Sequence, residues 1–321
     1  MPPIMTDLPA PVSPVMDKKP ASGSHTSSST SARLRIFSSV SIICFAFRAY
    51  YGIISPVIQT EKRMMKVLFL GSGTSTGVPV IGCTCGVCCS DKPENKRLRS
   101  SLLVQSETTT ILVDSCPDLR QQALRHNLTA IDAVIYTHEH LDHTAGFDDM
   151  RAFCWKREDR LPLYAGGQCL EQLKRMYAWA FSPQNTYKGY IRPDAHNHGG
   201  HPFTVGDIEV TPVLVQHASV ETYGYVFRCG GKSFGYVPDI KVLPADSVPL
   251  LRGLDALAMD ALTTREHHTH LTVDQCTELM LKLAPKQGYL THCGHAVDYD
   301  TACKETPEFI TPAYDGLAVE L

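Results

Sequence analysis

The 321-residue sequence lacks a strong excess of charge of either sign. Its 33 acidic residues nearly balance 30 basic ones, which gives a formal net charge of −3. Proteins that bind long nucleic acids usually carry a large basic surface. We therefore expect no long nucleic acid as a partner, whereas a small phosphorylated substrate needs only a few local positive groups.

The sequence also lacks an uncharged apolar run long enough to cross a membrane. Its most apolar stretch, residues 36–58, is broken by Arg48, Gly52 and Pro56, and the longest uncharged run spans only residues 36–47. A spanning helix needs roughly 20 apolar residues. The stretch also lies too far from the first residue for a typical signal peptide. We expect no stable membrane insertion and a cytoplasmic protein, with organelle targeting through residues 1–63 as the minor alternative.

Residues 1–35 contain little that could form a hydrophobic core. They are rich in Pro, Ser and Thr, and residues 22–31 are almost entirely polar. Such composition is typical of disorder. The sequence therefore predicts a disordered or weakly apolar extension over residues 1–63 and one folded domain over residues 64–321.

The 12 cysteines do not follow the pattern of a disulfide framework, which is typical of short secreted chains. Four of them crowd into residues 83–89, and the others are scattered along the chain. Clustering of this kind favours metal binding in a reducing compartment.

From residue 66 onward, apolar runs of strand length are interleaved with helical patterns, and no short-period repeat is present. This interleaving predicts α/β layers with mixed sheets. A capping box, Thr272 with Gln275, opens the last predicted helix. The predicted strands are 66–70, 101–105, 109–114, 133–137, 208–216, 223–229, 232–237, 257–260 and 289–291, and the predicted helices are 117–127, 167–180 and 272–283.

Residues 137–146, THEHLDHTAG, hold an unusual density of metal-ligating side chains directly after a predicted strand. His138 and His140 are two apart in near-extended chain and can face the same side. Asp142 and His143 follow as the chain turns and can reach a second ion. Imidazole with carboxylate suits Zn, Fe or Mn better than Ca or Mg. The alternative, a solvated polar loop, requires four ligand-type residues to coincide by chance.

The H-x-H-x-D-H pattern resembles the metallo-β-lactamase superfamily. Residues 71–79 (GSGTSTGVP), Asp114-x-x-x-Asp118 and residues 146–151 (GFDDMR) resemble more narrowly the phosphodiesterases of the carbon–phosphorus lyase pathway, which open a cyclic phosphate on ribose. The resemblance covers about residues 66–321. It implies an αβ/βα sandwich, with two mixed sheets inside and helices outside.

The same resemblance implies two catalytic divalent ions, Zn or Mn, that share a hydroxide. It assigns His138, His140, His217 and Asp239 to the first ion, and Asp142, His143, His292 and Asp239 to the second. Asp114 then orients ligands without binding metal. The alternative for Asp114 is a carboxylate at the start of the predicted helix 117–127.

The C-x-C-x-x-C spacing of Cys83, Cys85 and Cys88 suits a structural zinc site. By the same resemblance the fourth ligand is His295, with Cys293 as a competitor and Cys89 as a spare thiol. A redox pair or free thiols are the alternative.

Residues 270–272 (HLT) resemble the His-x-Thr element of the tRNA 3′-processing ribonucleases, whose His handles the leaving-group proton. We therefore expect His270 to be the general acid, oriented by Asp260, with Asp142 as the third residue of the catalytic set. His267 and His268 are alternatives, and Thr272 could serve only as a helix cap.

The sequence offers a few candidate residues for contact with the phosphate. Ser72 and Thr74 lie in a Gly-rich turn, and Arg97 and Arg99 offer guanidinium groups, although basic residues here also suit a solvated face. Residues 181–202, with His196, His198 and His201, are either a substrate lid or a variable loop.

The resulting functional hypothesis is a metal-dependent phosphodiesterase acting on a small cyclic or nucleotide-like phosphodiester, such as 5-phosphoribosyl 1,2-cyclic phosphate. A tRNA 3′-end endonuclease and a thioester or lactam hydrolase are alternatives. A zinc-binding regulatory protein with a lapsed site is a fourth, and the presence of every expected ligand argues against it. Self-association into a homodimer is left open.

Overall fold

The computed structural model describes residues 64–321, and the expectations for residues 1–63 lie outside this range. The strands form two seven-stranded sheets. The first comprises β1 (Lys66–Gly71), β2 (Ser101–Gln105), β3 (Thr110–Val113), β4 (Ala133–Ile135), β5 (Leu161–Ala165), β6 (Pro193–Asn197) and β14 (Ala318–Glu320). The second comprises β7 (Phe203–Val205), β8 (Ile208–His217), β9 (Val220–Cys229), β10 (Lys232–Val237), β11 (Ala256–Asp260), β12 (Gln287–Thr291) and β13 (Ile310–Pro312).

Both sheets are mixed, as predicted. The first has the order β14-β1-β2-β3-β4-β5-β6, antiparallel from β14 to β3 and parallel from β3 to β6. The second has the order β13-β12-β11-β10-β9-β8-β7, parallel from β13 to β10 and antiparallel from β10 to β7.

Short helices connect the strands. The α-helices are α2 (Gly86–Cys89), α3 (Leu119–Arg125), α4 (Leu141–Thr144), α5 (Arg151–Cys154), α6 (Gly167–Met176), α7 (Ala178–Phe181), α8 (Val248–Leu251), α9 (Val273–Leu283) and α10 (Tyr299–Glu305). Three 3₁₀ turns are η1 (Pro93–Asn95), η2 (Phe147–Met150) and η3 (Ala245–Ser247). Among residues 64–321, no helix is both long and apolar enough to span a membrane.

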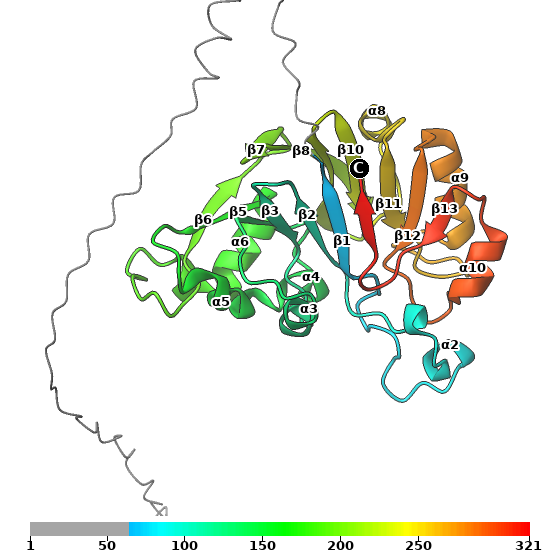
Figure 1. Ribbon diagram of the computed structural model, residues 1–321, viewed down its shortest axis with the longest axis horizontal. Helices are drawn as coiled ribbons and strands as arrows, with labels where there is room; N and C mark the ends of the chain where they lie inside the picture. Colours follow the sequence, from blue (N-terminus) through cyan, green and yellow to red (C-terminus); the bar gives the residue numbers. More distant parts are fainter. Residues whose placement is uncertain (1–63) are drawn as a thin grey trace, which may run out of the picture. The chain divides into compact units, whose positions relative to one another are not determined.

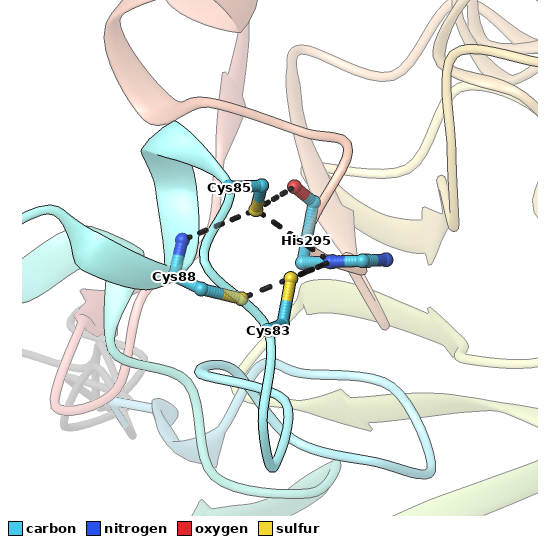
Figure 2. Close-up of side chains that lie close together, drawn as sticks. All are labelled: Cys83, Cys85, Cys88 and His295. Carbon is cyan, nitrogen blue, oxygen red and sulfur yellow. Dashed lines mark hydrogen bonds between the residues drawn. The ribbon is translucent and has the colours of Figure 1, made fainter.

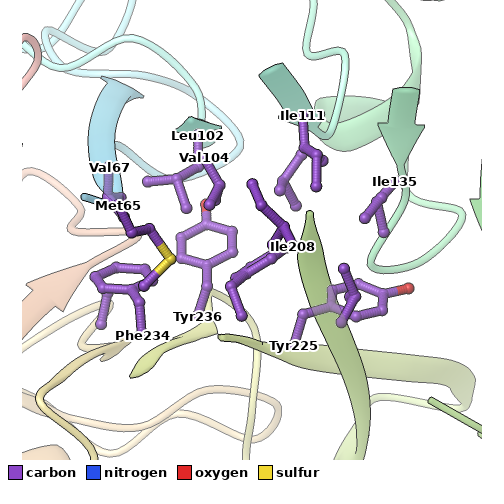
Figure 3. Close-up of a cluster of buried hydrophobic side chains, with 14 of the residues drawn as sticks. Met65, Val67, Leu102, Val104, Ile111, Ile135, Ile208, Tyr225, Phe234 and Tyr236 are labelled. Carbon is purple, nitrogen blue, oxygen red and sulfur yellow. The ribbon is translucent and has the colours of Figure 1, made fainter. Parts of the chain in front are cut away.

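The two sheets pack face to face around a central core. Alternating side chains from both sheets meet there, among them Val67 and Ile111 from the first sheet and Phe234 and Tyr236 from the second (Figure 3). A second core lies under α3, α5 and α6, and a third under α8, α9 and α10 (Figure 1). Helices therefore cover the outer face of each sheet, which confirms the predicted αβ/βα sandwich.

The candidate site residues follow the carboxyl ends of the strands. Asp114 follows β3, His138 lies just beyond β4, and His217 ends β8. Asp239 and His292 follow β10 and β12, which run parallel to each other in one sheet. Strand ends of both sheets therefore deliver these side chains to one region.

The predicted elements are confirmed in type, with differences at their ends. The strand predicted to reach residue 114 ends at Val113, because Asp114 has a left-handed backbone with φ 62°. The helix predicted over 167–180 divides at Tyr177 into α6 and α7. The predicted capping box at Thr272 and Gln275 is present. Part of 181–202 is β6, so this segment is not wholly a lid or loop.

Candidate metal centre

Three predicted imidazoles come together in the buried part of the site. His138 Nε2 lies 2.9 Å from His140 Nδ1, and His217 Nε2 lies 3.3 Å from the same His140 nitrogen. His138 and His140 come from the loop after β4, whereas His217 is the last residue of β8. The first sheet and the second sheet thus each contribute to one group of ligand atoms.

A second group lies beside the first. Asp142, His143 and His292 place ligand atoms within 4.8 Å of one another. Asp239 lies between the groups, with its Oδ2 3.1 Å from His143 Nε2 and its Oδ1 3.5 Å from His292 Nε2. The same Oδ1 is 3.7 Å from His217 Nε2. The position of Asp239 suits a carboxylate that bridges two ions.

Imidazoles of both groups are oriented through the ring nitrogen that faces away from the cluster. His143 Nδ1 donates to Asp114 Oδ2 at 2.7 Å, and His217 Nδ1 donates to the carbonyl oxygen of Thr269 at 2.9 Å. Ser100 donates its hydroxyl to Gly73 O and so accepts from His292 Nδ1, 3.0 Å away. In each case the Nε2 lone pair is left for a metal ion.

Asp114 lies fully inside the protein and does not serve helix α3. Its Oδ1 accepts from the backbone N–H of Thr137, and its Oδ2 accepts from the Thr137 hydroxyl, both at 2.9 Å. The N-cap of α3 is Asp118. The helix-start alternative for Asp114 is therefore wrong, and its contact with His143 suits the predicted orienting role.

The spacing of the donor atoms fits metal ions. Nitrogen ligands about 2.0–2.1 Å from a tetrahedral zinc lie roughly 3.3 Å from one another. The observed separations of 2.9 and 3.3 Å among the three imidazoles are close to this value. In addition, His143 Nε2 and Asp239 Oδ2 are buried and make no hydrogen bond of good geometry. Such orphaned buried atoms are costly unless an ion or water completes them.

The charge of the cluster also suits a cation. Burial acts to lower the pKa of His143, but Asp239, Asp142 and Asp114 together hold that pKa well above its usual range. Burial lowers the pKa of His292 to about 4 and that of His138 well below its ordinary value. The neutral imidazoles of His138 and His292 therefore lie beside the ionised carboxylates of Asp142 and Asp239, and Zn and Mn bind donors of both kinds.

His270 lies next to the cluster and pairs with Asp260. The loop that carries it follows β11, and its Nδ1 lies 2.7 Å from Asp260 Oδ2. Its ring stacks on His292 with centroids 5.1 Å apart and lies 4.6 Å from the ring of His217. Although burial acts to lower the pKa of His270, the hydrogen bond to Asp260 raises it above the usual value.

Neither alternative to His270 has a carboxylate hydrogen bond of this kind. His267 accepts from the backbone N–H of Thr269 at 3.4 Å, and His268 is exposed. Thr272 is the N-cap of α9, which agrees with the prediction that it caps a helix.

Cys83, Cys85, Cys88 and His295 form a separate cluster, in which the three thiols surround one imidazole nitrogen (Figure 2). The three sulfur atoms lie 3.2, 3.6 and 3.7 Å from His295 Nδ1. Tetrahedral zinc with bonds of about 2.3 Å to sulfur and 2.0 Å to nitrogen implies roughly 3.5 Å. The four residues can therefore hold one zinc ion.

The competitors for this cluster lie elsewhere. Cys293 is buried, with its Sγ directed at Thr291 O, and Cys89 is exposed outside the cluster. The hydrogen bond from the backbone N–H of Cys88 favours the thiolate of Cys85 and lowers its pKa to about 6. Burial raises the pKa of Cys88 to about 11.

The residues expected to contact phosphate differ in position. Thr74 lies at the edge of the cluster, with Oγ1 3.4 Å from His292 Nε2. Ser72 is fully buried and donates its hydroxyl to Asp315, so its position does not support a substrate contact. Arg99 is partly exposed but pairs with Asp118 at 2.9 Å. Arg97 is buried, so its position does not support a phosphate contact either.

Two of the histidines in residues 181–202 contact side chains of neighbouring strands. His198 is buried and lies 3.0 Å from the hydroxyl of Tyr225. His196 pairs with Asp194 and stacks on Tyr164. The segment therefore supports the edge of the first sheet.

A hollow of about 380 Å³ lies between the two clusters. Thr74 and His267 line it on the side of the His/Asp cluster, and His295 lines it on the side of the cysteines. Its lining includes Thr74 but none of the seven predicted ligands of the His/Asp cluster.

Several supporting residues were missed by sequence reasoning. Ser100, Thr137 and Thr269 orient imidazoles through a hydroxyl or a carbonyl, and they belong to residue types that are too common to stand out. Lys241 donates to the carbonyl oxygen of His270 and pairs with Glu266, so it holds the loop of the expected acid.

Comparison with known proteins gives a consistent result. Residues 109–293 match the family described as the beta-lactamase superfamily domain. The solved structure of a diphosphatase from the PhnP family is 37% identical, with a TM-score of 0.74, over 80% of this chain and 97% of that chain. The structure of Zn²⁺-bound PqqB from Methylobacterium extorquens shares the fold, with a TM-score of 0.67 at 21% identity over 80% of this chain and all of that one.

The octanoyltransferase of Porphyromonas gingivalis is 35% identical over 263 residues, which are 79% of this chain and 51% of that protein. The chain thus spans about half the length of this relative.

Proposed function

The chain belongs to the metallo-β-lactamase superfamily, and from that premise we propose that it is a two-metal phosphodiesterase acting on a small cyclic or nucleotide-like phosphodiester. The observation that carries the proposal is the His270–Asp260 pair beside a His/Asp cluster that fits two ions. A hydrolase that expels an alkoxide needs a proton donor at this position.

The protein's part in this chemistry is to hold the ions and position the phosphate. Two divalent ions, when bound, supply Lewis acidity toward phosphoryl oxygens and lower the pKa of water toward neutrality. His138, His140 and His217 would hold one ion, Asp142, His143 and His292 the other, and Asp239 both. Asp114, Ser100 and the Thr269 carbonyl keep the imidazoles in the tautomer that can bind metal.

His270 supplies the proton for the leaving oxygen. Its Nδ1 is engaged with Asp260, so the proton on Nε2 is the one available to a substrate. Asp260 stabilises the imidazolium before transfer, because its carboxylate accepts from Nδ1. Lys241 fixes the backbone of His270 through its carbonyl.

A second candidate is hydrolysis of a diphosphate. The similarity to the diphosphatase of the PhnP family favours this candidate, because that protein is 37% identical and this chain covers 97% of it. The leaving group is then a phosphate, which departs with less help from an acid than an alkoxide does, because its pKa is about 6. The dependence on His270 separates the two candidates.

A tRNA 3′-end endonuclease and a thioester or lactam hydrolase remain alternatives for the same metal cluster. The near-neutral charge of the chain disfavours the first, since tRNA docking needs a basic surface. The second has no need of the His270 acid.

The experiment that tests the proposal is a panel assay of the metal-loaded protein. The substrates are bis(nitrophenyl) phosphate, nucleoside cyclic phosphates, phosphoribosyl cyclic phosphate, a nucleoside diphosphate, precursor tRNA and lactoylglutathione. We expect turnover of the cyclic phosphates and of the nitrophenyl diester. Turnover confined to precursor tRNA or to lactoylglutathione would reject the proposal in favour of the corresponding alternative.

A further inference from the structure

Arg97 is a charged side chain that the proposed reaction does not use. Only 1% of it is exposed, and it is among the largest fully buried side chains of the described residues. It follows the Cys83–Cys88 segment and lies against the loop that runs from His292 to Val297. It therefore contacts the loop that carries one candidate ligand of each metal cluster.

All the hydrogen bonds of its guanidinium go to uncharged oxygens. Nη1 donates to the carbonyls of Gly294 at 3.1 Å and Val297 at 2.8 Å. Nε donates to Glu94 O and Nη2 to Asn95 Oδ1, both at 3.1 Å. Burial of a charge is costly, so the packing of this cation depends on these carbonyls staying in place.

The carbonyls belong to a strained and tightly held turn. His292 has a left-handed backbone with φ 55°. Gly294 lies two residues after His292 and immediately before His295. The backbone N–H of Cys293 donates to Ser72 O at 3.0 Å, and that of Gly294 donates to Leu262 O at 2.8 Å. The donors of this turn thus bind its neighbours, while two of its acceptors bind Arg97.

Gly294 lies between one candidate ligand of each cluster. His292 reaches Asp239 on one side, and His295 reaches the three thiols on the other. A displacement of the Gly294 carbonyl would move both imidazoles, because only two residues separate them.

We propose that Arg97 is a positioning residue that fixes the spacing of His292 and His295 and so couples the two metal sites. The proposal rests on the metal assignment given above. It predicts that loss of the guanidinium speeds the release of zinc from the cysteine cluster, although all four ligands of that zinc remain. By linkage, emptying either site weakens binding at the other by the same factor.

The test compares Arg97→Met with a matched control, Arg192→Met. Arg192 is also buried, at 8% exposed, and donates to the carbonyl of Arg157 at 3.0 Å, next to β6. Zinc release to a colorimetric chelator is followed after rapid mixing, together with metal content and melting temperature. Arg97→Lys keeps the charge with a different donor geometry and serves as the milder variant.

We expect zinc release to be at least about tenfold faster in Arg97→Met, intermediate in Arg97→Lys and unchanged in Arg192→Met, in line with the effect of residues that support ligands. Equal release rates in the wild type and Arg97→Lys, with Arg97→Met matching Arg192→Met or failing to fold, would overturn the coupling. Wild-type protein that holds no zinc at the cysteines would instead overturn the metal assignment on which the proposal rests.

Discussion

The His/Asp cluster and the Cys/His cluster are built in opposite ways. The first draws its side chains from the ends of strands in both sheets and is almost wholly buried. The second takes three residues from the segment Cys83–Cys88 and adds only His295 from a distant part of the chain. Two of its cysteines are half-buried, and His295 is exposed.

The difference indicates different roles. In the buried cluster, hydrogen bonds to the ring nitrogens that face away from the metal site hold the imidazoles. The metal-facing nitrogens stay free, and their positions are fixed more precisely. In the cysteine cluster all four side chains of a tetrahedral site are present, so no position is left for a substrate. The first arrangement suits catalysis and the second suits stability.

The largest expected effect on turnover comes from the buried cluster itself. In His140→Ala one of the converging imidazoles is lost, and with it part of the Lewis acidity, which contributes several kcal/mol. We expect turnover to fall by on the order of 10³-fold or more. Steady-state kinetics on the nitrophenyl diester measures the loss, and a variant within tenfold of wild type would contradict the role of His138, His140 and His217 as metal ligands.

The next effect concerns the acid. His270→Ala should lower turnover by about 10²–10⁴-fold on a diester with an alkoxide leaving group. On a nitrophenyl ester, whose leaving group needs no proton, the loss should be much smaller. The metal content should stay unchanged, and this separates loss of an acid from loss of a ligand. Equal losses on both substrates would mean that His270 positions the phosphate.

A smaller effect is expected from Asp114, which supports the metal ligand His143. Asp114→Asn keeps the shape of the side chain but removes the charge that faces His143 and Thr137. Residues that hold metal ligands typically contribute 10–100-fold in metal affinity. Titration of the metal-free protein with Mn or Zn should show a decrease of about that size. Affinity equal to that of the wild type would show that His143 needs no such support.

The smallest effect on turnover should come from the cysteine cluster. Cys85→Ser should lose one zinc and lower the melting temperature, because binding energy at a closed site is also folding energy. Turnover should change only through coupling to His292, by about fivefold. Cys89→Ser is the matched control, since Cys89 lies outside the cluster. Unchanged zinc content in Cys85→Ser would refute this cluster as a zinc site.

The two clusters also differ in how far the sequence could predict them. His138, His140, Asp142 and His143 lie within six residues, and the cysteines lie within another six, so each pattern is visible locally. Ser100 holds His292 across 192 positions, and Thr269 holds His217 across 52, which no local pattern can show. Hydroxyl and carbonyl groups also occur throughout any sequence, so their role depends on the fold.

The fold shows the same contrast. Strands inside the sheets, such as β1 and β10, are apolar runs and were predicted. Edge strand β6 is polar and largely exposed, with the sequence PDAHN, and was placed in a loop segment. An edge strand makes fewer demands on its side chains, because one side of its backbone has no partner strand.

The number of metal ions per chain decides whether the His/Asp cluster is a two-metal centre. Elemental analysis of purified protein, combined with native mass spectrometry, should give close to three ions, and His140→Ala should retain the zinc at the cysteines while losing occupancy at the His/Asp cluster. A count near one in the wild type, unchanged by His140→Ala, would contradict the two-metal centre.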